Sequence, residues 1–142
     1  MRFTFFVLLL CAAATALGSQ PATFNYQSKL TDSGGAPLQG VHTMFFSIYE
    51  GGDANTAGSG ALAYSESASV IASNGIVSHA VGTGTTLSTG SLSISTWLAS
   101  SSYFLEVSVD SPSNVVLPRS SIQPVPFASS AANSELSGAN AT

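Results

Sequence analysis

The chain has 142 residues, of which 44% are hydrophobic and 7% are charged. This length fits a single domain, and the hydrophobic content excludes a chain kept disordered by its charge. The formal net charge of −4 argues against nucleic acid or an anionic membrane surface as the binding partner. Neutral Ser, Thr, Gly, Asn and Gln residues supply most of the polarity, which suits a sheet wetted on one face.

Residues 1–19 are typical of a secretory signal peptide. Arg2 precedes an apolar core over residues 3–14, and small residues follow it. The core is too short for a spanning helix. A lipid anchor on Cys11 is the alternative, but the run Leu8-Leu9-Leu10 puts a bulky Leu before the cysteine where a small residue is needed. We therefore expect a secreted protein, extracellular or at the cell surface, without membrane insertion after signal removal; a periplasmic destination also fits.

Loss of the signal peptide would leave a domain that depends on its hydrophobic core. The only cysteine lies within this segment, so no disulfide can form. Lys29 and Arg119 would then be the only cations against seven acidic residues. We assign the β-domain to residues 20–128, a length that can bury a sufficient core. We expect residues 129–142 to form an Ala/Ser-rich, weakly helical tail or the start of a stalk.

Alternation of hydrophobic and polar residues predicts a series of short strands. Met44, Phe46 and Ile48 share one face of such a strand. The Asn74-Gly75 pair predicts a tight turn, because both residues tolerate positive φ, and hence a hairpin over residues 62–81. The predicted strands span residues 24–30, 41–49, 62–72, 76–81, 103–109 and 115–117.

Residues 82–102 are expected to form a long loop with one helical turn, because Ile94, Trp97 and Leu98 have i, i+3 and i+4 spacing. Prolines from Pro118 onward confine the last strand to a sheet edge or an extended segment. Short strands separated by turns, with no long helical pattern, predict an all-β fold. We expect an antiparallel β-sandwich or open barrel of about six to seven short strands.

No motif predicts catalysis, so we expect neither an enzyme nor a metal or other cofactor. His42 and His79 would need three converging strands to join Glu66 at a metal, and we interpret both as hydrogen-bonded strand residues. Residues 53–58 imitate the start of a calcium loop, but Tyr64 stands where a bidentate Glu is required. The serines lack a Gly-x-Ser-x-Gly elbow.

Glu66 shares its face with Tyr64 and Val70, which directs the carboxylate towards the core. A buried carboxylate needs a partner, and the mature chain offers only Lys29 and Arg119 as cations. The sequence therefore predicts a structural ion pair between Glu66 and Arg119.

Three aromatic residues, Phe45, Tyr49 and Phe104, fall on the less apolar faces of their strands. Aromatic rings on a wet face can stack on sugars or form a subunit contact. They are candidate ligand-binding residues, and a second covered face within one domain is the equally weighted alternative.

Four segments of the chain together resemble a known group of modules. They are FNYQSKLTDSGGAPLQGVHTMFFSIYE, AYSESASVIASNGIVSHAVG, YFLEVSV and LPRSSIQPVPFASSAA. The more specific motifs are Asn25-Tyr26-Gln27, Asn74-Gly75, and the run from Leu117-Pro118-Arg119 to Pro126-Phe127-Ala128. These motifs are similar to the N-terminal β-rich module of secreted bacterial fibre or adhesin-like proteins, of the tail-fibre-like and mosaic adhesive trimer type.

The resemblance implies a secreted, non-enzymatic structural or adhesive module of a bacterial cell-surface or fibre protein. It also implies self-association as a trimer and a glycan or other cell-surface ligand. A carbohydrate-binding module that uses the exposed aromatic residues is the alternative. Two features depart from the group: His79 stands at a usually apolar position, which questions tight packing there, and the chain ends at Thr142, where relatives continue into a stalk.

Overall fold

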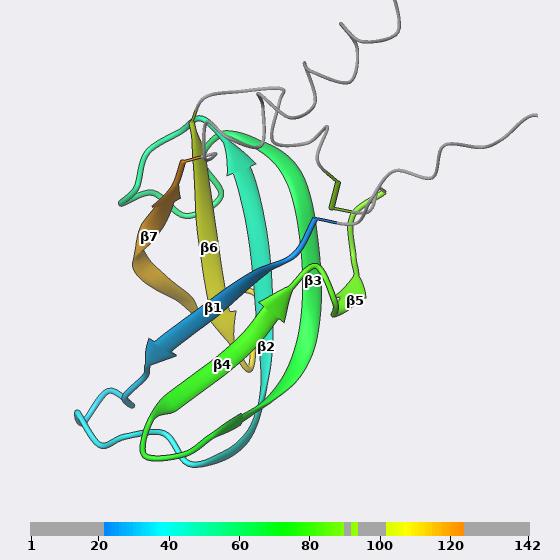
Figure 1. The fold of residues 1–142 in the computed structure, drawn as a ribbon. Helices are drawn as coiled ribbons and strands as arrows, with labels where there is room; N and C mark the ends of the chain where they lie inside the picture. The colour runs from blue at the N-terminus through cyan, green and yellow to red at the C-terminus, as the bar shows by residue number, and fades with distance from the viewer. Residues whose placement is uncertain (1–21, 90–91, 94–101, 124–142) are drawn as a thin grey trace, which may run out of the picture.

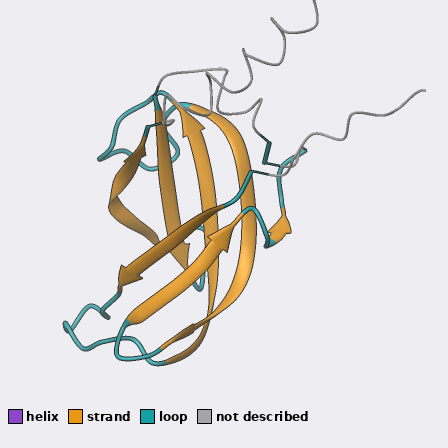
Figure 2. Cartoon of the chain, viewed as in Figure 1, coloured by secondary structure: helices purple, strands orange, loops and turns teal. Residues whose placement is uncertain are grey.

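The computed structural model describes residues 22–89, 92–93 and 102–123. Within these ranges the chain forms β-strands and no helix (Figure 2). The predicted signal peptide, helical turn and C-terminal tail lie outside the described residues. In chain order the strands are β1 (Phe24–Lys29), β2 (Gly40–Glu50), β3 (Ala61–Ala72), β4 (Ile76–Val81), β5 (Thr85–Thr86), β6 (Tyr103–Val109) and β7 (Val115–Ile122).

The strands form two antiparallel sheets that do not close into a barrel. The larger sheet has five strands in the order β5-β3-β2-β6-β7, and β1 and β4 form the smaller sheet. Figure 1 shows β1 and β4 crossing one face of the larger sheet. The prediction of an all-β antiparallel fold is confirmed, in its sandwich form.

Alternating hydrophobic rows fill the space between the two sheets. Met44, Phe46 and Ile48 of β2 are fully buried, as their spacing predicts. Tyr26 of β1 meets Phe46 edge to face, with ring centroids 5.3 Å apart, and so connects the two layers. The same alternation occurs in β6, where every second residue is buried: Tyr103, Leu105, Val107 and Val109.

The predicted hairpin over residues 62–81 forms only at its turn. Asn74 and Gly75 adopt φ values of 50° and 78°, and Ser73 pairs with Ile76 in an isolated bridge. Beyond that bridge β3 pairs with β2, whereas β4 pairs with β1. The Asn-Gly turn therefore carries the chain from one sheet to the other, which a strand pattern alone does not reveal.

The edges of the larger sheet differ in detail from the prediction. β7 continues beyond residue 117 to Ile122, with Pro118 inside it. Its place at the sheet edge confirms the expected position, because an edge strand tolerates a missing N–H. At the other edge, the short β5 lies where only a loop was expected.

The ladder between β6 and β7 contains an irregularity that positions Arg119. Leu105 pairs with Ser120, whereas Val107 pairs with Val116, so residues 117–119 stand opposite Glu106 alone. The extra residues leave the regular ladder. Arg119 instead directs its backbone N–H to the carbonyl oxygen of Ala54, at 2.8 Å.

Candidate functional site

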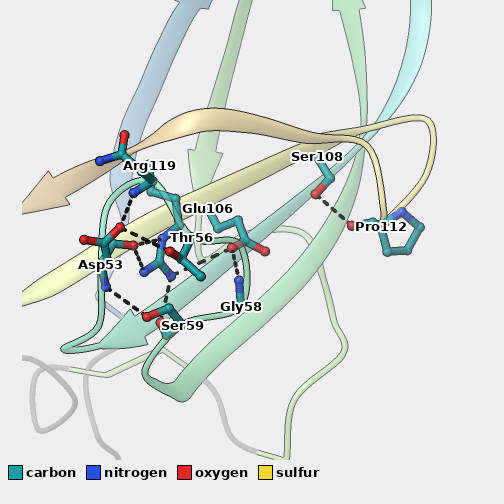
Figure 3. Close-up of polar contacts among 9 residues, drawn as sticks. Asp53, Thr56, Gly58, Ser59, Glu106, Ser108, Pro112 and Arg119 are labelled. Carbon is teal, nitrogen blue, oxygen red and sulfur yellow. Dashed lines mark hydrogen bonds and ion pairs between the residues drawn. The ribbon is translucent and has the colours of Figure 1, made fainter.

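Arg119 connects β7 to the loop of residues 51–60, which joins β2 to β3 (Figure 3). Its side chain is fully buried. Nε donates to the carbonyl oxygen of Asp53 at 3.1 Å and Nη1 to that of Ser59 at 2.9 Å, while Nη2 also donates to Asp53. The guanidinium thus holds two backbone carbonyls of one loop. We call this arrangement, with the rings and carboxylate described next, the Arg119 clamp.

Two predicted ligand-binding residues, Tyr49 and Phe104, belong to the Arg119 clamp. Cζ of Arg119 lies 5.2 Å from the ring centroid of Tyr49 and 5.1 Å from that of Phe104, a range in which cation–π attraction operates. Burial raises the pKa of the Tyr49 phenol, and the nearby charge of Glu106 raises it further. Phe45, the third predicted aromatic, is half-buried and is not part of these contacts.

Glu106 supplies the carboxylate of the clamp. Its Oε2 lies 3.8 Å from Nη1 of Arg119 and accepts the backbone N–H of Gly58 at 2.6 Å. Only 8% of the Glu106 side chain is exposed. A carboxylate this well buried needs both a cation and N–H donors, and the clamp provides them from β7 and from the loop.

The predicted ion pair between Glu66 and Arg119 is wrong. Arg119 pairs with Glu106, and Glu66 pairs with His79 of β4 at 2.7 Å. The reason is the alternation of side chains across the sheet. Glu106 follows Leu105 in β6 and faces away from the core, with Arg119, whereas Glu66 faces the inner layer with Tyr64.

Glu66 forms a second polar centre, with no exposed surface. Its carboxylate accepts four hydrogen bonds: from the Tyr64 hydroxyl and His79 Nε2 at 2.7 Å each, and from the N–H groups of Gly82 and Gly84 at 3.0 Å each. Burial, followed by the hydrogen bond to Glu66, raises the pKa of Tyr64 to about 12. These bonds attach the 82–84 turn and β4 to β3.

His79 also stacks on Phe46, with ring centroids 4.9 Å apart and planes inclined by 21°. His79, a polar residue at a usually apolar position, is therefore packed against an aromatic ring and hydrogen-bonded to a carboxylate. Both histidines are hydrogen-bonded strand residues, as predicted: His42 lies 2.8 Å from Asp110 through Nδ1.

The His42–Asp110 pair ties the start of β2 to the turn after β6. Nδ1 of His42 faces Oδ2 of Asp110, and Nε2 faces the carbonyl oxygen of Gln39 at 3.2 Å. Because both ring nitrogens face acceptors, the protonated ring is favoured. The hydrogen bond to Asp110 accordingly raises the pKa of His42, and the same bond lowers the pKa of Asp110.

The amino-acid sequence matches one protein family over most of the described strands. A family model described as "Domain of unknown function (DUF8740)" matches residues 25–119. The chain belongs to this family. The match begins in β1 and ends at Arg119, so both the clamp and the Glu66 centre lie within it. No curated protein and no solved structure matches the chain significantly.

The described residues contain neither a cluster of metal-ligating side chains nor a membrane-spanning helix. Among the described residues, no three His, Cys, Asp or Glu side chains gather closely enough to hold a metal ion. In the same part of the chain, no helix has the length and apolar character needed to cross a membrane.

The sequence analysis predicted none of the three ion pairs, His42–Asp110, Glu66–His79 and Arg119–Glu106. Glu66 was predicted to face the core, and His79 shares one face of its strand with Val77 and Val81, so the alternation carried a signal for their contact. Arg119 meets Glu106 only because the register shift turns residues 117–119 towards the loop. No spacing in the sequence reports that shift.

Proposed function

We propose that the domain is a secreted, non-enzymatic structural or adhesive module of a bacterial cell-surface or fibre protein. The observation that supports this most is the Arg119 clamp. Its guanidinium donates to the protein's own backbone, and Glu106 is engaged by the loop in return. Buried charges used in this way fix loops to a sheet, which is what a rigid extracellular module without disulfides requires.

The resemblance of the strand and turn motifs to modules of secreted fibre proteins supports the same function. The Glu66 centre adds to it, because four donors from three segments converge on one carboxylate. Self-association, with a trimer as the expected form, belongs to this proposal.

Carbohydrate binding through Phe45, Tyr49 and Phe104 has less support. The rings of Tyr49 and Phe104 already contact the Arg119 guanidinium, whereas sugar stacking needs a free ring face. Binding to a glycan array that is lost in Phe45→Ala would favour this alternative. No binding to any glycan on the array would refute it.

Export and adhesion test the proposal together. The full chain, with a C-terminal epitope tag, is expressed in a bacterial host, and the product is located and its N-terminus determined by mass spectrometry. We expect a protein outside the cytoplasm that begins near residue 20. Beads coated with it should resist detachment from bacterial cells under flow better than albumin-coated beads, or light scattering should show a trimer. A cytoplasmic product, or an exported monomer that retains no beads, would refute the proposal.

A further inference from the structure

A groove of about 540 Å³ lies between the 30–38 loop and the turn after β6. Its apolar lining comes from Leu30, Leu38, Val109 and Val116. Leu30 and Val109 are buried, while Val116 keeps 38% of its surface exposed. The groove thus offers apolar surface that a guest side chain could cover.

The groove lies at the end of the sandwich opposite both exits of the described chain. The strand registers establish this: Lys29 pairs with Ile76, and Met44 pairs with Val109, so β1 and β6 end beside the starts of β4 and β2. At the other end, Phe24 pairs with Val81 and Tyr103 with Ile122. Figure 1 shows the same arrangement along the strands. If the domain is attached to a larger structure through the chain before β1 or after β7, the groove lies at its unattached end.

Two carboxylates border the apolar lining. Oδ1 of Asp32 accepts the N–H groups of Gly34 and Ala36, at 2.9 Å each, and no hydrogen bond from the described residues reaches its Oδ2. The Asp110 side chain is 57% exposed, although its oxygens contact His42 and the N–H of Thr43. Both carboxylates therefore retain oxygen lone pairs directed to solvent.

Among the described residues, His42 is the cation that faces these carboxylates: its protonated ring contacts Asp110 and offsets part of that charge. No ion pair among the described residues involves Asp32. Arg119 is buried in the clamp, and Lys29 is not among the residues that line the groove. Asn114 lies there as well, and its side-chain N–H donates to the carbonyl oxygen of Val109 at 3.0 Å, which leaves its amide oxygen as an additional acceptor. The polar rim is thus acidic and rich in acceptors.

We propose that this groove binds the side chain of a lysine or arginine on a protein partner. The aliphatic stem would cover the apolar lining, and the cationic head would contact Asp32 and Asp110. Basic side chains commonly divide themselves in this way between apolar surface and a polar end. The negative net charge of the chain would also draw a basic partner towards it. The inference rests on the proposed adhesive function, for which it names the chemistry of the partner.

Two short peptides test the inference on the purified wild-type protein by ¹⁵N–¹H NMR. The probe is acetyl-Ala-Lys-Ala-amide, and its control carries norleucine, which keeps the stem without the ammonium group. We expect the lysine peptide to shift the amide signals of Asp32, Ser33, Asp110 and Asn114 at low salt, where charge contacts are least screened. The norleucine peptide should bind about tenfold more weakly.

Isosteric variants test whether the two carboxylates of the groove bind the ammonium group of the lysine peptide. Asp32→Asn and Asp110→Asn together remove both carboxylates, while each new amide oxygen can still accept the backbone N–H groups. Asn also tolerates the φ of 59° at residue 110. This double variant should bind the lysine peptide about tenfold more weakly. The matched control is Asp53→Asn, which changes an exposed aspartate that caps its own turn and should alter the affinity less than about twofold.

Several results would overturn the inference: no shift at the groove, equal binding of both peptides, or an effect of Asp53→Asn as large as that of the double variant. Shifts that depend only on protein concentration would assign the groove to a second copy of the chain. Export and bead retention without peptide binding would refute this inference but not the proposed function. Peptide binding by a protein that stays in the cytoplasm would refute the proposed function but not the binding of a basic side chain in the groove.

Discussion

Replacing Arg119 with methionine tests whether the clamp stabilises the domain. Methionine keeps an unbranched stem of similar length but has no donor and no charge. Two carbonyl oxygens of the 51–60 loop, those of Asp53 and Ser59, would lose their guanidinium donors. Glu106, with 8% of its side chain exposed, would lose its cation.

The expected cost follows from these losses. Removing one partner of a buried ion pair costs about 3–5 kcal/mol, because the other charge stays buried. Glu106 keeps the N–H of Gly58, and water can reach parts of a surface loop, so the lower end of this range applies. We expect the free energy of unfolding to fall by about 3 kcal/mol, a large part of the 5–15 kcal/mol typical of a domain.

Equilibrium unfolding in urea, followed by far-ultraviolet circular dichroism, measures this change. The matched control is Lys29→Met, which removes the same charge from an exposed strand position and should cost less than about 0.5 kcal/mol. Arg119→Lys should lie between the two, because lysine keeps the charge but not the planar fork.

The reasoning fails if Arg119→Met costs less than about 1 kcal/mol with an unchanged dependence on urea. A double-mutant cycle with Glu106→Gln provides the second check, since glutamine can still accept from Gly58. If the clamp is a coupled unit, the combined variant should be more stable than the two separate losses predict. Simple additivity would mean that Arg119 and Glu106 act independently.

Three further predictions concern other parts of the fold. Glu66→Gln replaces a carboxylate that has four donors with an amide that has one acceptor oxygen, and should lower the unfolding free energy in urea by about 3 kcal/mol or more; a loss below about 1 kcal/mol would contradict it. The His42–Asp110 contribution should be complete between pH 3.8 and 6.5, lost as pH falls through the lowered pKa of Asp110 and as it rises through the raised pKa of His42; NMR titration of the His42 ring should show a pKa above 6.5 that returns towards 6.5 in Asp110→Asn. Gly75→Ala should destabilise the domain more than Gly35→Ala in thermal unfolding, because both glycines have positive φ but only a Cβ at residue 75 would meet a backbone oxygen, at 2.5 Å; equal losses would refute the steric argument.

The strands were predictable because each buries one face. The row Met44, Phe46 and Ile48 alternates in the sequence and is fully buried in the structure. The bounds of β6 agree with the predicted strand for the same reason. By contrast, β5 has only two residues, which is too short for any periodicity, and its pairing with Glu66 and Ser67 depends on the 82–84 turn.

Polar pairing was less predictable, because it depends on register and on loops. Glu106 and Ser108 fall on the outward face of β6, where alternation predicts contact with water. Both are buried: Glu106 lies under the 51–60 loop, and the Ser108 hydroxyl donates to the carbonyl oxygen of Pro112 at 3.1 Å (Figure 3). Loops that fold back over a sheet leave no periodic signal, so the covered outer face could not be read from the strand pattern.

The Arg119 clamp and the two aspartates of the groove lie at opposite ends of the sandwich, and this separation allows the two proposals to be tested independently. The clamp lies where β2 passes into β3, at the end from which both exits of the described chain leave. Asp32 and Asp110 lie at the opposite end, beside the groove. Residues at the first end are buried and bonded to backbone, whereas the two aspartates expose oxygen to solvent. Variants of Arg119 should therefore lower stability without weakening peptide binding by the remaining folded protein. The isosteric variants at Asp32 and Asp110 should weaken peptide binding, and their stability cost should be limited to the loss of the His42–Asp110 pair. If every variant changed stability and peptide binding together, the clamp and the groove would form one cooperative unit. The assignment of one end to rigidity and of the other to partner contact would then be wrong.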